Sequence, residues 1–259
     1  AVRLGLAGDV PEGGSSRGLE LPSIDVNRLE LALLLGALAL VVGFRLVPLS
    51  TVYREGHIVL SSNDPYSYRY WVEGLLQNPD ITLSTLPSGV TSSEPLMVST
   101  LWLAALALGG SPDAAGHVLA WYPVVSAAIT ALLLYALAVV VTDDRRIGLA
   151  AVAMLAVIPG HALRTSLGFA DHHAFDYAWL ALTLLGLALV ASAATGRGRS
   201  PAGRELVATG IVAVGVTGQT LAWDNSPVLI LPVGGYLAVE AIRSVRDSNS
   251  PVRSGGPVV

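Results

Sequence analysis

Two groups of residues suited to metal binding or acid–base chemistry interrupt an otherwise apolar chain, Asn63-Asp64-Pro65 and Asp171-His172-His173. Carboxylates and imidazoles are costly at the rim of a bilayer, so their presence there indicates function. Asp171 and His173 are spaced i, i+2, which lets both side chains reach one ion from a turn or a short extended segment. A carboxylate with an imidazole suits Mn²⁺, Mg²⁺ or Zn²⁺. The two groups can share one divalent cation if they emerge on the same membrane face.

Each group also has a purely structural interpretation. A Ser/Asn/Asp run followed by proline is typical of a helix start, so Asp64 can be a capping residue with Pro65 at the first helical position. The histidines can be interfacial residues beside a capping aspartate, a role that Asp176 would serve equally well. The two interpretations of Asp64 are compatible, because an aspartate at a helix start is held rigidly.

Arg164 lies seven residues before Asp171 and is the arginine nearest to the Asp-His-His group. A guanidinium beside a metal at the membrane surface is suited to bind an anionic lipid headgroup. The alternative is a snorkelling charge with no partner in the site. Trp223, in Trp223-Asp224-Asn225, is interpreted as an interfacial anchor.

The composition predicts an integral membrane protein. The chain is 53% apolar and only 13% charged, whereas about 25% of a typical soluble protein is charged. There are no cysteines, which excludes disulfides and thiolate metal sites. The net charge of −4 argues against nucleic acid as a partner.

Six segments approach the roughly 20 apolar residues that a membrane-spanning helix needs. They are Leu29–Pro48, Val118–Val141, Ile147–Leu163, Tyr177–Ala194, Leu206–Trp223 and Ser226–Ile242. A seventh apolar segment, Pro95–Pro112, is a further candidate.

Arginine placement is used to choose the topology, because cytoplasmic loops collect positive charge. Six spans, with Pro95–Pro112 on or dipping into the outer side, leave only Arg54, Arg69 and Arg164 outside and Arg45 near the outer end of the first helix. Seven spans fit the charge bias nearly as well, but they put Asp64 and Asp171 on opposite faces. We therefore predict six.

The predicted architecture is an all-α, polytopic membrane protein with about six transmembrane helices. Residues 1–28 are expected to form a cytoplasmic tail, and residues 29–245 the transmembrane domain, with 51–116 as a long external loop. Residues 246–259 are interpreted as a polar C-terminal segment and a point of truncation. The expected location is the cell membrane, with the site on the external face.

From about residue 29 to 245 the chain resembles the catalytic subunit of oligosaccharyltransferase in its archaeal form. Ser62-Asn63-Asp64-Pro65-Tyr66 resembles the first acidic motif of that family, in the first external loop. The stretch from Arg164 to His173 resembles the second, in which an arginine leads into Asp-x-His. Trp223 matches the tryptophan at the end of the fifth helix.

The resemblance implies a fold similar to that of type C glycosyltransferases and a glycosyltransferase activity. The family transfers an oligosaccharide from dolichol phosphate or diphosphate to the asparagine of an Asn-x-Ser/Thr sequon. The implied partners are thus a lipid-linked oligosaccharide, an acceptor protein with a sequon, and the membrane. Asp64, Asp171 and His173 would be metal ligands, with manganese or magnesium favoured over zinc. Asp64 would also face the acceptor amide, and Arg164 would lie near the lipid phosphate.

One departure from the family is large. A later external loop that supplies a glutamate, and a C-terminal domain with a Trp-Trp-Asp-Tyr-Gly motif, do not occur before Val259. We therefore expect the chain alone to bind metal without glycosylating a sequon.

Three other hypotheses remain open from the residues. The first is another lipid-phosphate-dependent glycosyltransferase, such as a mannosyltransferase, which should lack the arginine before Asp-His-His. The second is a transporter or channel fragment, which predicts charges near helix centres rather than at helix ends. The third is a non-catalytic scaffold, in which Asp171 and His173 would not affect metal affinity.

Overall fold

The computed structural model describes residues 28–194 and 202–246, which are almost entirely helical. The predicted tail 1–28 and C-terminal segment 246–259 lie outside these residues, apart from Arg28 and Arg246. The elements are α1 (Arg28–Arg45), α2 (Leu49–Val52), β1 (Tyr53–Arg54), β2 (His57–Ile58), α3 (Asp64–Leu76), α4 (Ser88–Thr91), α5 (Pro95–Ala107), α6 (Pro112–Thr142), α7 (Arg145–Val157), α8 (Pro159–Arg164), α9 (His172–Ala194), α10 (Ala202–Ala222) and α11 (Pro227–Arg246). The two short strands pair antiparallel. The predicted all-α fold is confirmed.

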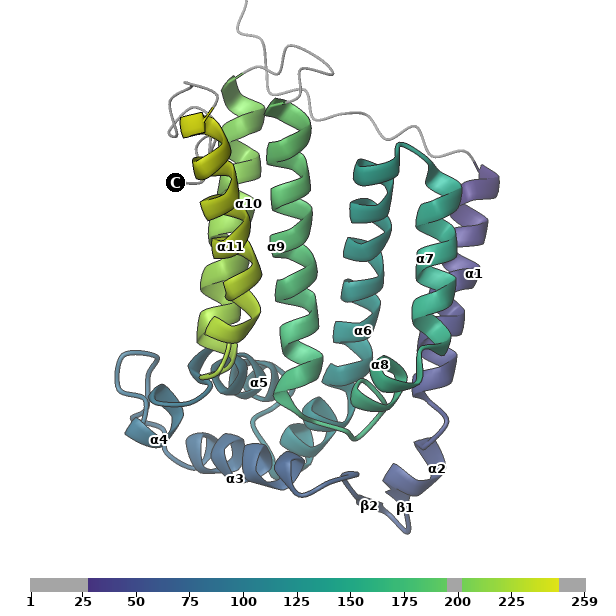
Figure 1. Cartoon of the computed structure of the whole chain (residues 1–259). Coiled ribbons are helices and arrows are strands. Elements are labelled where there is room, and N and C mark those ends of the chain that lie inside the picture. The colour runs from purple at the N-terminus through teal and green to yellow at the C-terminus, as the bar shows by residue number, and fades with distance from the viewer. Residues whose placement is uncertain (1–27, 195–201, 247–259) are drawn as a thin grey trace, which may run out of the picture.

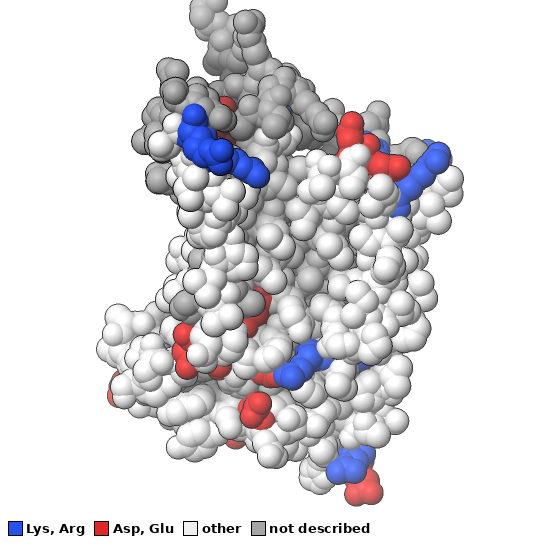
Figure 2. All heavy atoms as spheres, viewed as in Figure 1, with Lys and Arg blue, Asp and Glu red and all other residues white. Residues whose placement is uncertain are grey.

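The long helices form a bundle, with the short elements gathered at one end (Figure 1). α1 packs against α7, α7 against α6, α6 against α9, and α9 against α10. α11 runs along the same bundle, while α3, α5 and the hairpin lie across one end of it (Figure 1). Figure 2 shows charged side chains gathered towards the two ends, with a largely uncharged surface between them.

Among the described residues, α6, α9 and α10 are long and apolar enough to cross a membrane. α5 is apolar but has only 13 residues. Such a helix rises about 20 Å, which is short of the roughly 30 Å hydrocarbon core. α5 lies across one end of the bundle (Figure 1), and the placement of Pro95–Pro112 on the outer side of the membrane stays a prediction.

The predicted third span, Ile147–Leu163, is wrong as a single helix. α7 ends at Val157, and a separate short helix, α8, begins at Pro159. Proline has no N–H to continue the ladder and disfavours helical geometry in the residue before it. Ile158 accordingly adopts an extended conformation, with φ −63° and ψ 113°.

Three other helices begin at least four residues earlier than predicted, among them α10, which starts at Ala202 rather than at Leu206. α6 starts at Pro112 rather than at Val118, because the Ser111 hydroxyl caps it by accepting a hydrogen bond from Ala114 N at 3.1 Å. α9 starts at His172 rather than at Tyr177. Asp171 therefore directly precedes a helix, and both histidines lie in the first helical turn instead of in a turn or extended segment.

Arg45, the last residue of α1, is completely buried. Its guanidinium donates to Val41 O at 3.1 Å, to Ala156 O at 2.8 Å and to Leu155 O at 2.9 Å. The last two carbonyls belong to the final turn of α7, where backbone acceptors have no partner within the helix. Arg45 therefore caps the end that Pro159 leaves open, and its positive charge suits a helix C-terminus.

Arg45 also holds the segment that leads to the Asp-His-His group. Its Nε donates to Thr165 Oγ1 at 3.1 Å, and Nη2 donates to His161 Nδ1 at 2.7 Å. Its backbone carbonyl accepts from Leu167 N at 2.9 Å. One side chain thus joins α1, α7, α8 and the loop before Asp171.

Gly168, in the loop before Asp171, is hydrogen-bonded to the segment that precedes Asp64. Its carbonyl accepts from Ser61 N, and its N–H donates to Ala120 O, both at 2.9 Å. Its φ is +80°, and a Cβ there would lie 2.7 Å from Val52 Cγ2. Only glycine adopts this conformation readily and leaves that space. The loop before Asp171 and the segment before Asp64 therefore meet at the same end of the bundle.

α10 approaches α9 closely through glycines. A Cβ at Gly218 would lie 2.3 Å from the Trp179 ring, and one at Gly215 would lie 2.5 Å from Thr183 Oγ1. Small residues of this kind allow helix backbones to pack tightly in a membrane. This packing fixes the end of α10, and with it Trp223, relative to the start of α9.

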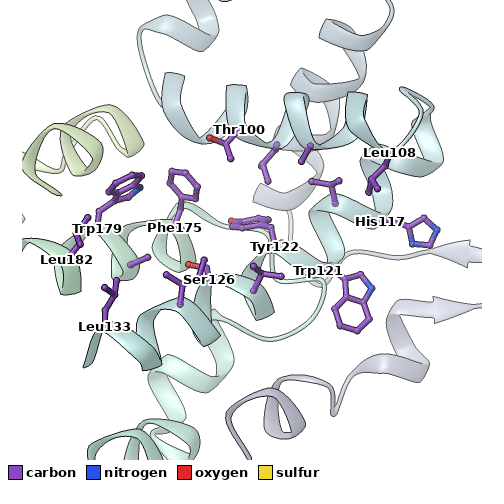
Figure 3. A pocket seen from close by; sticks show the side chains of 16 residues that line it. Thr100, Leu108, His117, Trp121, Tyr122, Ser126, Leu133, Phe175, Trp179 and Leu182 are labelled. Atoms are coloured by element: carbon purple, nitrogen blue, oxygen red, sulfur yellow. The ribbon is translucent and has the colours of Figure 1, made fainter. Parts of the chain in front are cut away.

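An apolar groove of about 550 Å³ lies between α5, α6 and α9. Thr100 lines it from α5, and Leu108 from just past the end of that helix. Trp121 lines it from α6, and Phe175 and Trp179 from α9 (Figure 3). Its volume falls within the roughly 300–1,000 Å³ of small-molecule sites.

Replacing Arg45 with Met is expected to destabilise the bundle strongly. Each buried acceptor left unsatisfied costs roughly 1–3 kcal/mol, so the free energy of unfolding should fall by about 3 kcal/mol or more. Unfolding in detergent micelles, followed by circular dichroism, measures this. Arg54→Met on the exposed hairpin is the matched control, and equal stabilities of the two variants would contradict the role assigned to Arg45.

Replacing Gly168 with Ala is expected to cost about 1–3 kcal/mol, through the positive φ and the contact with Val52. Gly160→Ala, in α8, is the control, because a Cβ at that position meets nothing within 4 Å. The same unfolding measurement compares them. A Gly168 variant as stable as the Gly160 variant would show that the loop is not constrained as described.

Candidate metal centre

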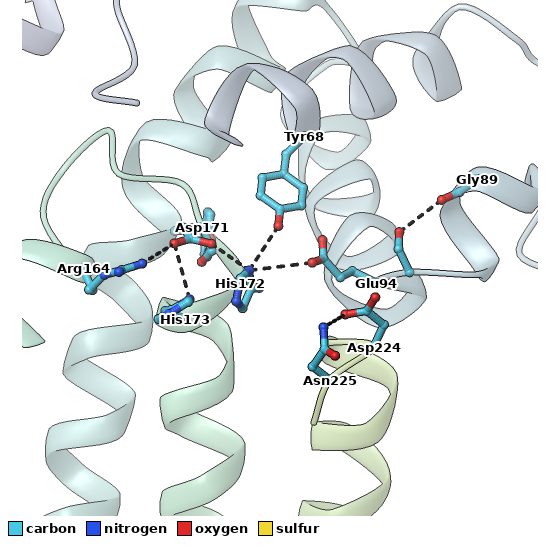
Figure 4. A network of polar contacts seen from close by, with 11 residues as sticks. Tyr68, Gly89, Glu94, Arg164, Asp171, His172, His173, Asp224 and Asn225 are labelled. Atoms are coloured by element: carbon cyan, nitrogen blue, oxygen red, sulfur yellow. Dashed lines mark hydrogen bonds and ion pairs between the residues drawn. The ribbon is translucent and has the colours of Figure 1, made fainter. Parts of the chain in front are cut away.

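Asp171 is the centre of a compact group of charged and ring side chains (Figure 4). Its side chain is 3% exposed, and Oδ1 lies 2.7 Å from His172 Nδ1. Oδ2 lies 3.0 Å from Arg164 Nη1 and 3.4 Å from His173 Nδ1. The sequence-predicted residues Arg164, Asp171 and His173 are therefore brought together.

The backbone around Asp171 is fixed by α6. The Tyr122 hydroxyl donates to the carbonyl of Asp171, and the Ser126 hydroxyl donates to the carbonyl of Ala174. Ala174 N donates in turn to Asp171 O at 3.2 Å, which closes the first turn of α9. Asp171 is therefore presented by a rigid helix start rather than by a free loop.

The donor set of this group fits a divalent cation. Asp171, His172 and His173 each offer a ligand atom, and these atoms lie within 4.8 Å of one another. His173 Nδ1 and His172 Nε2 are buried without a hydrogen-bond partner in the described part of the chain. Buried polar atoms normally have such partners, and unpaired ones in a native structure are consistent with a bound ion.

Asp64 lies at the same end of the bundle but outside this group of ligand atoms. It is the first residue of α3 and is exposed. The residue at the N-cap is Asn63, and no side chain makes a capping hydrogen bond there. The capping interpretation of Asp64 therefore finds no hydrogen bond to support it, and a role of Asp64 in metal binding remains a prediction.

Arg164 is not a lone snorkelling charge. It ends α8, and its guanidinium lies 5.8 Å from the centre of the Phe169 ring as well as beside Asp171. Its side chain is 42% exposed. Among the described residues only Nη1 makes a hydrogen bond, to Asp171 Oδ2. The other N–H groups of the guanidinium are available to a ligand.

Two residues of the segment between α1 and α6 reach the group and were missed in the sequence. Glu94 Oε1 lies 3.7 Å from His172 Nδ1, and the Tyr68 hydroxyl lies 3.5 Å from the same nitrogen. A signal for Glu94 was present, because Glu94-Pro95 repeats the pattern of Asp64-Pro65, an acidic residue followed by a proline at a helix start. Tyr68 had no such signal.

Trp223 covers the histidines from the end of α10. Its ring stacks on that of His172, with centroids 4.8 Å apart and an angle of 14° between the planes. The ring of His173 is 6.2 Å away. Trp223 is thus part of the site wall, beyond the interfacial anchor that the sequence predicted.

The electrostatics keep Asp171 ionised. Burial raises the pKa of its carboxyl, but the hydrogen bond with His172 and the charges of both histidines and Arg164 outweigh this and hold the pKa below its ordinary value. The pKa of Glu94 is raised, mainly by burial, although Tyr68 and His172 lower it in part. Burial, followed by the charge of Glu94, raises the pKa of Tyr68. An anionic ligand atom is therefore ready at Asp171.

Comparison with known proteins agrees with the resemblance seen in the sequence. The family model described as oligosaccharyl transferase STT3, N-terminal, matches residues 87–233. A comparison with curated proteins gives no match.

Solved structures of similar fold come from Archaeoglobus fulgidus. The crystal structure of its oligosaccharyltransferase in the apo form has a TM-score of 0.69 and 22% sequence identity, and the match covers 80% of this chain and 25% of that one. The archaeal oligosaccharyltransferase AglB in complex with an inhibitory peptide and a dolichol-phosphate has a TM-score of 0.69 and 22% sequence identity, and the match covers 81% of this chain and 25% of that one. The complex of the Archaeoglobus fulgidus oligosaccharyltransferase with Zn and sulfate has a TM-score of 0.65 and 22% sequence identity, and the match covers 79% of this chain and 26% of that one.

These likenesses show the fold, and the chain spans about a quarter of the length of those proteins. The family assignment rests on the sequence match, which extends over more than half of the 259 residues. The chain therefore belongs to the family of the N-terminal region of the oligosaccharyl transferase STT3.

Proposed function

We propose that this chain provides the membrane-embedded catalytic region of an oligosaccharyltransferase. The reaction is transfer of a glycan from dolichol phosphate or diphosphate to the asparagine of an Asn-x-Ser/Thr sequon. The observation that carries the proposal is the contact of Arg164 and His173 with one carboxylate, Asp171, at the end of the bundle. Family membership and the complex of a similar archaeal enzyme with a peptide and dolichol-phosphate support it.

Asp171 and His173 would hold a divalent cation, together with Asp64 from the neighbouring segment. His173 Nδ1 is buried, makes no hydrogen bond among the described residues and lies 3.4 Å from the ionised Asp171, which supports this assignment. Oxygen and nitrogen donors suit manganese or magnesium, and the complex of a similar enzyme with Zn keeps zinc in consideration. A bound cation would supply Lewis acidity to the oxygens of the departing phosphate.

Arg164 would bind the lipid phosphate. Its side chain is partly exposed, and the donors that Asp171 does not use can pair with phosphate oxygens. Asp171 orients the guanidinium, so that its charge is in place before negative charge develops on the leaving group.

Asp64 would accept hydrogen bonds from the acceptor amide. An asparagine nitrogen is a poor nucleophile because its lone pair is delocalised into the carbonyl. A carboxylate that accepts its N–H groups would weaken this conjugation. The exposure of Asp64 at the start of α3 leaves its oxygens accessible to a peptide.

The orientation proposed for the chain puts this site on the external face of the cell membrane. Residues 29–245 would form the transmembrane domain, with 51–116 as its long external loop. The gathering of α3, α5 and the hairpin at the end that carries Asp171 supports this arrangement (Figure 1). A polyprenyl tail can then remain in the lipid while its headgroup meets water.

Changing the proposed ligands is expected to weaken metal binding. Asp171→Asn and His173→Ala should each lower the affinity for Mn²⁺ by at least about tenfold, and Asp64→Asn should do so if its carboxylate completes the site. Calorimetric titration of the purified chain measures this. His57→Ala on the hairpin is the control, and unchanged affinity in the Asp171 and His173 variants would favour the scaffold hypothesis.

Replacing Arg164 with Gln is expected to weaken binding of dolichol phosphate by about tenfold, because charge-assisted hydrogen bonds to the phosphate are lost. Mn²⁺ affinity should change much less, since Arg164 is not a ligand. The matched control is Arg54→Gln. If both arginine variants bound the lipid equally well, Arg164 would not be the phosphate-binding residue.

A further inference from the structure

A second pocket adjoins the apolar groove and differs from it in chemistry. It has a volume of about 350 Å³ and is lined by polar and charged groups, among them His57, Arg69, Asp113 and His117. His117 lines both the groove and this pocket. The polar pocket and the apolar groove therefore meet at His117, a residue in the second turn of α6. Figure 3 shows His117 at the edge of the groove.

This junction lies where a membrane interface is expected. α6 is the longest helix able to span, and the groove runs along it from His117 past Trp121 towards Leu133. The polar pocket lies between the hairpin, α3 and the first two turns of α6. Tryptophan and tyrosine favour this depth, and Trp121 and Tyr53 occupy it here. The groove therefore lies in the hydrocarbon region and the pocket in the headgroup region.

A hydrogen-bonded chain orients His117. Trp121 Nε1 donates to the Tyr53 hydroxyl at 3.0 Å, and that hydroxyl lies 3.0 Å from His117 Nδ1. Indole can only donate, so the arrangement that satisfies all three groups has Tyr53 donating to His117. The proton of the neutral ring is then on Nε2. The Tyr53 and His117 rings also stack, with centroids 5.6 Å apart. His117 thus has an N–H donor to offer to a ligand.

Arg69 adds a positive charge to the polar pocket. Its Nε donates to Glu73 at 2.6 Å and Nη1 to Ile58 O at 3.4 Å. Nη2 makes no hydrogen bond among the described residues. The guanidinium packs over Gly116, whose Cβ position lies 3.7 Å from Arg69 Cζ. It is therefore held in place with donors to spare, as phosphate recognition requires.

We propose that the groove and the polar pocket together bind one bilayer phospholipid. A hydrocarbon chain would occupy the groove between α5, α6 and α9, and the phosphate would accept hydrogen bonds from Arg69 and His117. Hydrogen-bond complementarity favours this occupant, because Arg69 and His117 offer N–H donors where a lipid carries its phosphate. Glu73, paired with Arg69, and Asp113, in the pocket lining, balance the positive charge there. A protein helix packed in the groove would leave both donors unmatched.

The site is separate from the one proposed for the donor lipid. Neither Arg164 nor Asp171 nor His173 lines the groove or the polar pocket. The phosphates of the two lipids would therefore be bound by different residues. The groove shares a wall with the metal centre, because Tyr122 and Ser126 line it and their hydroxyls hold the carbonyls of Asp171 and Ala174. The substitutions that test the phospholipid site are therefore placed at other positions.

Native mass spectrometry of the purified chain in micelles tests the proposal. One probe is a dioleoyl phospholipid, and the other is dioleoylglycerol, which has the same acyl chains but no phosphate. The wild-type chain should retain one phospholipid and bind the diacylglycerol about tenfold more weakly, as expected for loss of charge-assisted hydrogen bonds. Arg69→Gln and His117→Phe should weaken binding of the phospholipid and leave binding of the diacylglycerol unchanged.

Filling the groove tests the other half of the site. Ala104, on α5, lines the groove, whereas Ala107 on the same helix is exposed and does not line it. Ala104→Phe should lower the affinity for both lipids by about tenfold or more, and Ala107→Phe should change neither affinity. Arg54→Gln is the control for Arg69.

Four outcomes would overturn the proposal. Equal binding by the Ala104 and Ala107 variants would place the lipid elsewhere. Equal binding of the two probes would remove the phosphate from the recognition. Displacement of the phospholipid by polyprenyl phosphate, with Arg164→Gln abolishing the displacement, would assign the groove to the donor. A dimer that Ala104→Phe dissociates would assign it to a second copy of the chain.

Discussion

A single buried guanidinium organises the end of the bundle that carries the site. A positive charge in the interior is expensive unless every donor finds a partner. Arg45 meets this requirement without a carboxylate, by donating to helix-end carbonyls, to a hydroxyl and to an imidazole. The acceptors come from α7, α8 and the loop beyond them. The position of that loop, and hence of Asp171, depends on a residue that no ligand would touch.

The candidate site is assembled from segments that are distant in the sequence. Arg164 ends α8, Asp171 directly precedes α9, and the histidines begin α9. Glu94 directly precedes α5, and Trp223, just after α10, covers the group. Asp171 is paired with Arg164 and His172, whereas His172 Nε2 has no hydrogen-bond partner among the described residues and so remains a donor atom for a cation. The clustering of these residues at a helix end, rather than at a helix centre, also separates this arrangement from the transporter hypothesis.

The sequence was sufficient where the signal is local. Apolar length predicted most of the bundle, and the spacing of Arg164, Asp171 and His173 predicted neighbours that the structure brings together. The break at Pro159 was missed because the apolar run continues through it. The contacts of Arg45 with Thr165, and of Glu94 with His172, arise from chain segments that meet only in the folded bundle. No pattern in a single sequence reports such pairs. The position of Asp64 relative to the ligand atoms likewise depends on how distant segments pack, so the sequence alone could not predict it.

The capping of α7 by Arg45 has a consequence for how such chains diverge. The carbonyls of Leu155 and Ala156 are open only because Pro159 ends the ladder there. In a descendant that lost this proline and extended the helix, those carbonyls would accept hydrogen bonds within the helix. The buried guanidinium of Arg45 would then have lost two of its acceptors. Positions 45 and 159 should therefore be inherited as a pair, and a relative that lacks one is expected to lack the other.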